Sequence, residues 1–418
     1  MRTLLVLLAS TSLAACGGAG VQTAGSAAPA TGTGGGTSTG SGSGTVTPSS
    51  GHTFVTPTES KTYSGIGGVQ NYQYKTNNID GDPSTPAIDP SSVQYGQLYA
   101  GNASTARNSG ISISYNPRDA IFELTVNEPL GNVTNTTRFQ DPAHRTDFGG
   151  AREPQGGNID ITSKGVRYLE VGGGVGVALF DPSVSTTFPI GSKDSSRTGT
   201  TFFYQLPGTT TKYVTYAGYV RNSISISEVV LPSGGRYFEN KFSLDRGAFV
   251  FGERTASSAV PKTGTGAFNG QMIATMVFNP LLDTDADAPT YFQWMQGTSS
   301  TVVNFGANTF TLGLNGTVAS PLFDTYTSKV FTLQNGATFT AAGSGRIDLV
   351  NAGGFLGNFQ TASFRQPDGT ILTVNIAGSS ADGAFFGPAA EEVGGGFRIV
   401  GGTPDERIDI LGAFTGAK

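Results

Sequence analysis

The amino-acid sequence predicts an all-β protein, in which a β-rich domain is followed by a C-terminal eight-stranded antiparallel soluble β-barrel. Glycine accounts for 61 of 418 residues, and charged residues for only 13%. Val, Ile, Thr, Tyr and Phe recur in short alternating runs between Gly and Asn, a composition typical of strands and turns rather than helices. Asn-Gly and Asp-Gly pairs in the C-terminal part supply the positive φ that two-residue hairpins need.

The N-terminus carries an export signal. Met1-Arg2 is a short positive region, and the apolar run Leu4–Leu8 is too short to span a bilayer as a helix. Cys16, the only cysteine, follows Leu13-Ala-Ala, where a bacterial lipoprotein signal needs a thiol to carry diacylglycerol. We therefore expect residues 1–15 to be a lipoprotein signal peptide and Cys16 to be the lipid attachment site. The alternative is an ordinary secretory signal with a chance cysteine.

Residues 16–51 are expected to form the lipidated cysteine and a flexible tether. Beyond Cys16 this stretch is Gly, Ser, Thr and Ala with almost nothing apolar, so it cannot bury enough surface to fold. Fully stretched, it would reach about 110–120 Å. The domains that follow would therefore work well away from the bilayer to which the lipid anchors them.

Residues 52–255 are predicted to form the β-rich domain. Apolar and polar residues alternate in Ile111–Tyr115, Ile121–Val126 and Ile224–Ser227. This is the period of half-buried strands.

Residues 256–418 are predicted to form the barrel. Asn315-Gly316, Asn335-Gly336 and Asp368-Gly369 separate short alternating runs, and about eight strands fit between residues 261 and 418. That number suits a closed up-and-down barrel with a filled interior. A membrane-spanning barrel is the less favoured alternative, because the strands look short, charged residues are scattered among them and a lipid anchor would be redundant.

Candidate catalytic residues are few. The chain has two histidines, His52 and His144. His52 lies at the end of the tether, so a catalytic site would have to use His144 with the nearby Asp141 or Asp147. A hydrolase using these residues is an alternative, but a lone loop histidine is more often a solvated side chain. We therefore predict a protein that is not an enzyme.

The best candidate metal ligands are Asp283, Asp285 and Asp287, whose carboxylates on alternate residues could gather around calcium. Ala288 and Trp294 stand where an EF-hand needs Gly and Glu. A solvated acidic turn is therefore favoured, and no metal or cofactor is predicted.

One group of side chains is a candidate ligand-binding region, because Tyr and Arg are the usual anchors of binding surfaces. On alternating strands half of these side chains would point inward, so core packing is favoured for any single one. The group comprises Tyr204, Tyr213, Tyr216, Tyr219 and Arg221, of which the last four are the weak ligand-binding candidates.

The C-terminal Gly- and Phe-rich stretch resembles the closing hairpin of the barrel in transferrin-binding protein B-like surface lipoproteins. That family ends in a Phe-Gly-Pro-x-Ala-x-Glu-x-Gly-Gly-x-Phe run and a Gly-x-Phe-x-Ala-Lys tail. The matching residues are Phe386, Gly387, Pro388, Ala390, Glu392, Gly394, Gly395, Phe397, Gly412, Phe414, Ala417 and Lys418. Tyr213–Tyr219 and Phe249–Thr255 are similar to stretches of the "handle" domain that precedes the barrel in that family, and Pro261–Gly270 to its barrel entry motif.

The resemblance implies a handle and a barrel, one of each in this chain, displayed at the cell surface by a lipid anchor in the outer membrane. It implies capture of a protein or iron- or haem-related ligand, with a TonB-dependent receptor as partner. A structural or adhesive display module is the alternative. Nucleic acid is not expected as a partner, because the net charge is −5 and the chain has no basic stripe.

Overall fold

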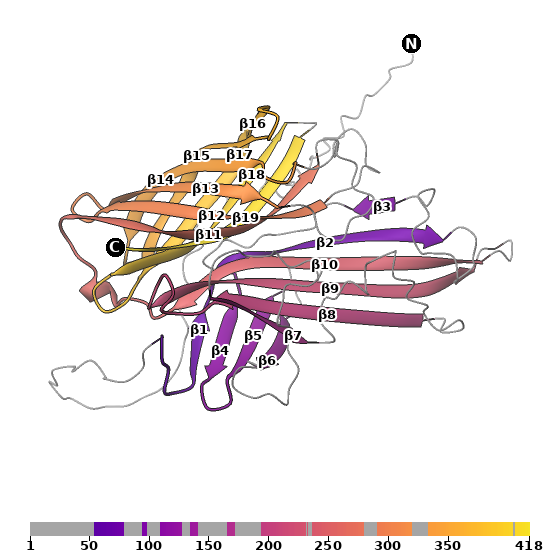
Figure 1. Ribbon diagram of the computed structural model, residues 1–418, viewed down its shortest axis with the longest axis horizontal. Coiled ribbons are helices and arrows are strands. Elements are labelled where there is room, and N and C mark those ends of the chain that lie inside the picture. The colour runs from indigo at the N-terminus through magenta and orange to yellow at the C-terminus, as the bar shows by residue number, and fades with distance from the viewer. Residues whose placement is uncertain are drawn as a thin grey trace, which may run out of the picture.

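The structure is a computed structural model that describes residues 54–78, 94–97, 109–127, 134–140, 165–171, 194–230, 232, 236–279, 291–319, 333–403 and 406–418. These residues form three antiparallel sheets, which we call the small sheet, the large sheet and the barrel. In Figure 1 the large sheet runs across the middle, with the barrel above it and the small sheet below. Within the described ranges, no helix has the length and apolar character that a membrane crossing requires.

The strands divide cleanly between the sheets. The small sheet has the order β1 (Lys61–Ser64), β4 (Ser112–Asn116), β5 (Ile121–Asn127), β6 (Thr134–Gln140). The large sheet has the order β3 (Gln94–Gln97), β2 (Ile66–Asn78), β10 (Arg236–Gly252), β9 (Val214–Val230), β8 (Asp194–Gln205), β7 (Val166–Val171). A 3₁₀ turn, η3 (Ser257–Ala259), leads into the barrel strands β11 (Thr265–Asn279), β12 (Tyr291–Asn304), β13 (Thr309–Val318), β14 (Thr338–Asp348), β15 (Gly354–Arg365), β16 (Ile371–Thr373), β17 (Ile376–Phe386), β18 (Glu392–Thr403) and β19 (Glu406–Ala417).

The large sheet is covered on both faces. Side chains alternate across a strand, and on β10 Val250 packs in the cluster shared with the barrel while Phe251 packs in the cluster shared with the small sheet. On β9 Tyr216 and Tyr219 divide in the same way. The sheet therefore contributes to two hydrophobic cores at once.

The barrel is closed by eight strands, as the sequence predicts. β19 pairs with both β18 and β11, and β14 pairs with β15, so β11 to β15 and β17 to β19 form a continuous ring. One seam differs from the others. β15 pairs with β17 over only three residues, Phe355 to Gly357, and with the short strand β16 at its other end. Between these pairings the Ser379 hydroxyl accepts a hydrogen bond from the Phe359 amide at 2.9 Å.

Phenylalanine and glycine fill the barrel interior together. Phe355 lies against Gly383, where a Cβ atom would come within 2.1 Å of the ring, and Phe397 lies in the same way against Gly412, at 2.3 Å. The alternation of small and large residues in the sequence thus corresponds to rings packed over bare backbone.

The structure confirms one of the predicted hairpin turns and contradicts another. Asp368-Gly369 is a turn between β15 and β16, and Gly369 has a φ of 90°. The prediction of a turn at Asn315-Gly316 is wrong, because both residues lie inside β13 and pair with β12 and β14. Gly297 on β12 explains this, because its missing side chain leaves room for the Asn315 carbonyl oxygen, 1.9 Å from where a Cβ would stand. Close packing of two strands overrides the local turn preference.

A buried carboxylate joins the barrel to the large sheet. Glu392, at the start of β18, accepts hydrogen bonds from the backbone N–H groups of Lys212 at 2.6 Å, Tyr213 at 2.8 Å and Val214 at 3.1 Å. These amides lie at and just before the start of β9, and Glu392 supplies an acceptor for each of them. Burial raises the pKa of Glu392, and the three N–H donors act in the opposite direction.

A second polar contact lies further along the same interface. The Gln70 side-chain amide on β2 donates to the backbone carbonyl of Asp409 on β19 at 3.1 Å. The Asp409 carboxylate in turn pairs with Arg398 on β18 at 2.9 Å. Apolar packing between barrel and large sheet is therefore supplemented by directional contacts at two separate places, which fix their relative orientation.

The Gly383 contact yields a test within one strand. Gly383→Ala should destabilise the fold by about 1–3 kcal/mol, because the new methyl group would overlap the Phe355 ring in a filled interior. Gly378→Ala on the same strand is the matched control, since nothing lies within 4 Å of its Cβ position. Urea unfolding followed by circular dichroism measures both, and equal midpoints for the two variants would contradict the packing described.

Glu392→Gln should destabilise the protein by about 1–3 kcal/mol, because an amide cannot accept from all three N–H groups. Glu391→Gln is the control, since the Glu391 carboxylate accepts from one backbone amide, that of Ala389. The difference should also depend on pH. A carboxyl whose pKa is raised on folding contributes stability that is fully present below its unfolded pKa, about 4.3, and is lost as pH rises through the folded value. The advantage of the wild type over Glu392→Gln in urea unfolding should therefore shrink between about pH 4 and pH 7, and an advantage that grows would contradict the raised pKa.

Candidate functional site

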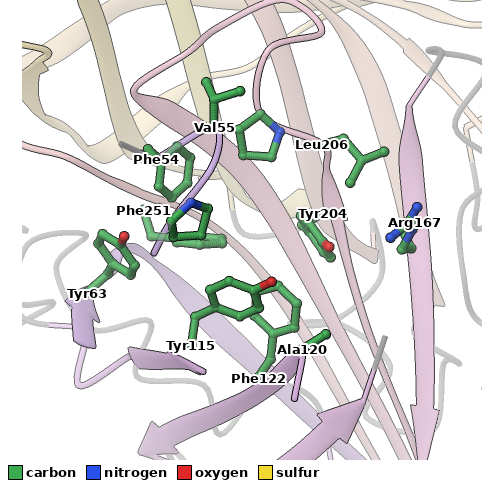
Figure 2. Close-up of a pocket in the computed structure, with 12 residues that line it drawn as sticks. Phe54, Val55, Tyr63, Tyr115, Ala120, Phe122, Arg167, Tyr204, Leu206 and Phe251 are labelled. Carbon is green, nitrogen blue, oxygen red and sulfur yellow. The ribbon is translucent and has the colours of Figure 1, made fainter. Parts of the chain in front are cut away.

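A pocket lies between the small sheet and the large sheet, with a volume of about 250 Å³. Its walls are mainly aromatic, and Figure 2 shows the rings facing one another across the space. The aromatic lining residues are Phe54, Tyr63, Tyr115, Phe122, Tyr204 and Phe251. Val55, Pro57, Ala120, Arg167, Leu206 and Pro207 complete the lining.

Phe54 places the first described segment of the chain against the pocket. Its ring meets Tyr63 edge-to-face at a centroid distance of 5.4 Å and Phe251 at 5.5 Å. Edge-to-face pairs add to the hydrophobic gain of burial. Phe54 is buried while the adjacent Val55 is 41% exposed, so the segment forms a wall on its inner side and meets solvent on its outer side.

Tyr63 connects the pocket wall to a charged pair. Its hydroxyl donates to Glu253 Oε1 at 3.0 Å, and Glu253 also forms an ion pair with Lys61. Burial, followed by the charge and hydrogen bond of Glu253, raises the pKa of Tyr63 well above its usual range. The phenol therefore stays protonated and acts as a fixed hydrogen-bond donor, which leaves its ring to line the pocket.

The small sheet supplies the opposite wall through the hairpin of β4 and β5. Tyr115 and Phe122 lie side by side, with ring centroids 4.5 Å apart. Ala120, between them in sequence, also lines the pocket and has a φ of 49°. This left-handed conformation is unfavourable for a residue with a Cβ atom, so the turn needs other contacts to hold it.

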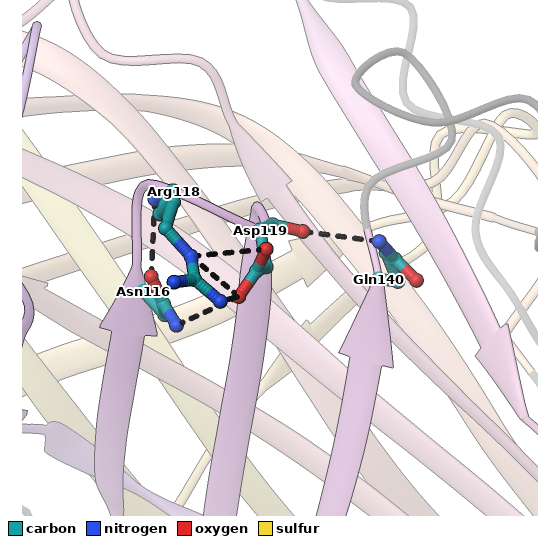
Figure 3. A network of polar contacts seen from close by, with 4 residues as sticks. All are labelled: Asn116, Arg118, Asp119 and Gln140. Atoms are coloured by element: carbon teal, nitrogen blue, oxygen red, sulfur yellow. Dashed lines mark hydrogen bonds and ion pairs between the residues drawn. The ribbon is translucent and has the colours of Figure 1, made fainter.

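Those contacts form a small polar network, drawn in Figure 3. The Asn116 side-chain oxygen accepts from the Arg118 amide at 3.0 Å, and its nitrogen donates to Asp119 Oδ2 at 3.3 Å. Arg118 pairs with Asp119 at 3.1 Å. Gln140 on β6 donates to the Asp119 carbonyl at 3.1 Å. The network ties the turn to itself and to the neighbouring strand, and thereby sets the position of Tyr115 and Phe122.

The tyrosines predicted as binding candidates lie in different places. Tyr216 and Tyr219 are each 2% exposed, the first in the core facing the barrel and the second in the core facing the small sheet. Tyr213 is half-buried and packs against the barrel-side core. Tyr204 is buried, and it is the member of this group that lines the pocket.

Arg221 belongs to a polar contact between three strands. Its side chain is 25% exposed and pairs with the buried Asp245 carboxylate on β10 at 3.4 Å. Asn71 on β2 donates to the same carboxylate. Burial raises the pKa of Asp245, while the Asn71 hydrogen bond and the Arg221 charge act in the opposite direction. Arg221 is therefore placed to neutralise a buried charge.

Several sequence candidates lie outside the described residues. They are Cys16, His52, Asp141, His144, Asp147, Asp283, Asp285 and Asp287. Among the residues that are described, no three His, Cys, Asp or Glu side chains gather closely enough to hold a metal ion.

Sequence reasoning missed most of the pocket. Phe54, Tyr115 and Phe251 come from segments far apart in the chain, and only the fold brings them to one place. The alternation in 111–115 and 121–126 predicts two strands with an apolar face, but it does not say what that face covers.

Phe54→Ala should loosen the N-terminal wall of the pocket. Loss of the two edge-to-face contacts should allow the segment to detach, so that amides of β1 exchange with solvent at least about tenfold faster. Val55→Ala is the matched control, because that side chain is 41% exposed and is not part of the aromatic contacts. Hydrogen exchange measured by mass spectrometry reports both, and equal protection of β1 in the two variants would contradict the role assigned to Phe54.

No family model and no curated protein matches the chain. Solved structures give weak similarities. The intact transferrin-binding protein B "Ap-TbpB (N and C lobes)" is 11% identical over 86% of this chain and 79% of that one, with a TM-score of 0.26. A mutant of the Haemophilus parasuis Hp5 protein is 12% identical over 87% and 79%, with a TM-score of 0.26. The isotype 1 protein of serogroup B Neisseria meningitidis is 12% identical over 86% and 77%, with a TM-score of 0.22. Such low scores do not establish a family for this chain.

Proposed function

We propose that the chain is a surface lipoprotein, anchored in the outer membrane through Cys16, that captures a protein or iron- or haem-related ligand as the co-receptor of a TonB-dependent transporter. The observation that carries the binding role is the aromatic pocket between the two sheets. A binding module needs apolar surface that a partner can reach, whereas a passive display module does not. The pocket, with Val55 41% exposed beside it, supplies such surface.

The surroundings of the pocket favour binding over catalysis. The Tyr63 hydroxyl is engaged as a donor to Glu253, and Glu253 is paired with Lys61. A general base or nucleophile needs a side chain positioned to react with a substrate, and these groups are instead positioned to hold one another. Aromatic rings held in this way provide contact area at low entropic cost.

The rest of the fold supports presentation of the pocket. The large sheet packs on the barrel, and Glu392 fixes the start of β9 at this interface. The pocket wall on β8 and β10 is therefore attached to a barrel with its own filled core. Joined to the membrane by the tether expected in residues 16–51, this body would be free to move as a unit.

Anchoring is tested by fractionation of intact cells. The wild type should sediment with the outer membrane and be removed by protease added outside the cells. Cys16→Ala should no longer carry lipid and should leave the outer-membrane fraction, whereas Ser10→Ala, within the same signal, should behave as the wild type. Full protection of the wild type from external protease would overturn surface display.

The uptake role is tested by affinity capture of the full-length protein from outer membranes of iron-starved cells. Recovery of one TonB-dependent receptor is the expected result, and what that receptor imports would then identify the ligand. Recovery of no receptor, with the bait folded by circular dichroism, would favour the structural or adhesive display module instead.

A further inference from the structure

The size of the pocket restricts what can enter it. Sites that enclose drug-sized ligands and cofactors typically measure about 300–1,000 Å³, whereas a cavity of about 150 Å³ already accepts benzene. At about 250 Å³, this pocket is too small to enclose a haem and large enough for one bicyclic ring. It suits a single bulky side chain better than a whole cofactor.

The walls restrict the chemistry further. Phe54 stands nearly perpendicular to Tyr63 and Phe251, at 79° and 85°, so the space is bounded by both ring edges and ring faces. An incoming aromatic ring can therefore pack edge-to-face or offset-stacked against these rings, which are the geometries that aromatic pairs prefer. The described lining residues include an arginine and no carboxylate, which disfavours a cationic group of the kind that aromatic cages often bind.

The more exposed lining residues suit contact with a larger partner. Val55 is exposed beside the buried Phe54, while Tyr115 and Leu206 are half-buried at the edge of the core that lines the pocket. Apolar residues around a pocket exclude water from a side chain inserted into it, the arrangement found around dominant anchors of protein interfaces.

We propose that this pocket receives one aromatic side chain, presented by the captured protein, as the anchor of the interface. The inference rests on the proposed function, since it names the chemistry by which a protein ligand is recognised. Tryptophan fits best among natural side chains, because its bicyclic ring makes the fullest use of the volume.

The first arm of the test measures the pocket alone. The full-length protein in lipid nanodiscs is titrated with N-acetyl-tryptophanamide by isothermal calorimetry, and binding with a Kd of about 0.1–1 mM is expected for a fragment of this size. Leu206→Trp and Val55→Trp each place a ring of the protein's own at the pocket and should weaken binding at least about tenfold. Val350→Trp is the matched control, because Val350 is 91% exposed in the turn between β14 and β15.

Three results of this arm would overturn the assignment. They are no binding by a folded wild type, equal binding by the control and both pocket variants, and equal binding of N-acetyl-leucinamide, which would show that the pocket has no aromatic preference. Two pocket variants are used so that misfolding of one, detected by circular dichroism, still leaves the other to decide.

The second arm repeats the capture from outer membranes with the same variants. Loss of the captured protein with Val55→Trp and its retention with Val350→Trp would support the proposal. Retention with both would overturn the anchor role and leave the proposed capture function standing. If the wild type binds N-acetyl-tryptophanamide but captures no protein, the capture function fails, and the pocket belongs to a free aromatic compound instead.

Discussion

The large sheet has no solvent-facing side over much of its length, and this constraint shapes the rest of the molecule. Residues 214–220 of β9 and 244–252 of β10 are buried without interruption. A strand in this position has to supply apolar groups on both faces, and it therefore reads as a nearly continuous apolar run instead of an alternating one. The stretch around Tyr216 and Tyr219 has this character. Neighbouring tyrosines there serve two cores, so their spacing in sequence does not mark a surface.

Covering both faces also decides where polar groups have to be satisfied. Amides at the start of β9 lie where the barrel meets the large sheet, and a side chain from the barrel, Glu392, accepts their hydrogen bonds. On the other face the small sheet packs on the large sheet, and among the described residues the aromatic pocket lies where these two sheets meet. Hydrophobic surface becomes reachable from solvent where this covering ends, and the candidate site follows from the same packing that makes the core.

The sequence is informative where local chemistry decides the structure. Glycine is the favoured residue for a positive φ, so the turn at Gly369 could be predicted. The repeated Gly and Phe from Gly383 to Phe397 likewise predict the filled interior of a narrow barrel. Asn315-Gly316 could not be interpreted correctly, because the deciding contact comes from Gly297 on another strand. The pocket was beyond prediction for the same reason. Phe54 and Tyr115 become pocket residues only through Phe251 and Tyr204, which are at least 89 residues away in sequence.

The barrel is not equally strong around its circumference. Elsewhere in the ring, neighbouring strands share long ladders of backbone hydrogen bonds, whereas β15 and β17 share three residue pairs, with the Ser379 hydroxyl and the short strand β16 occupying the rest of the edge. Breaking this seam costs fewer backbone hydrogen bonds than breaking any neighbouring one. Thermal fluctuations should therefore separate β15 from β17 before any other pair of strands in the barrel. The strands that pack on the large sheet, β11, β18 and β19, should remain folded during this local opening. Local opening between β15 and β17 should therefore leave the large sheet, which carries the pocket wall, undisturbed.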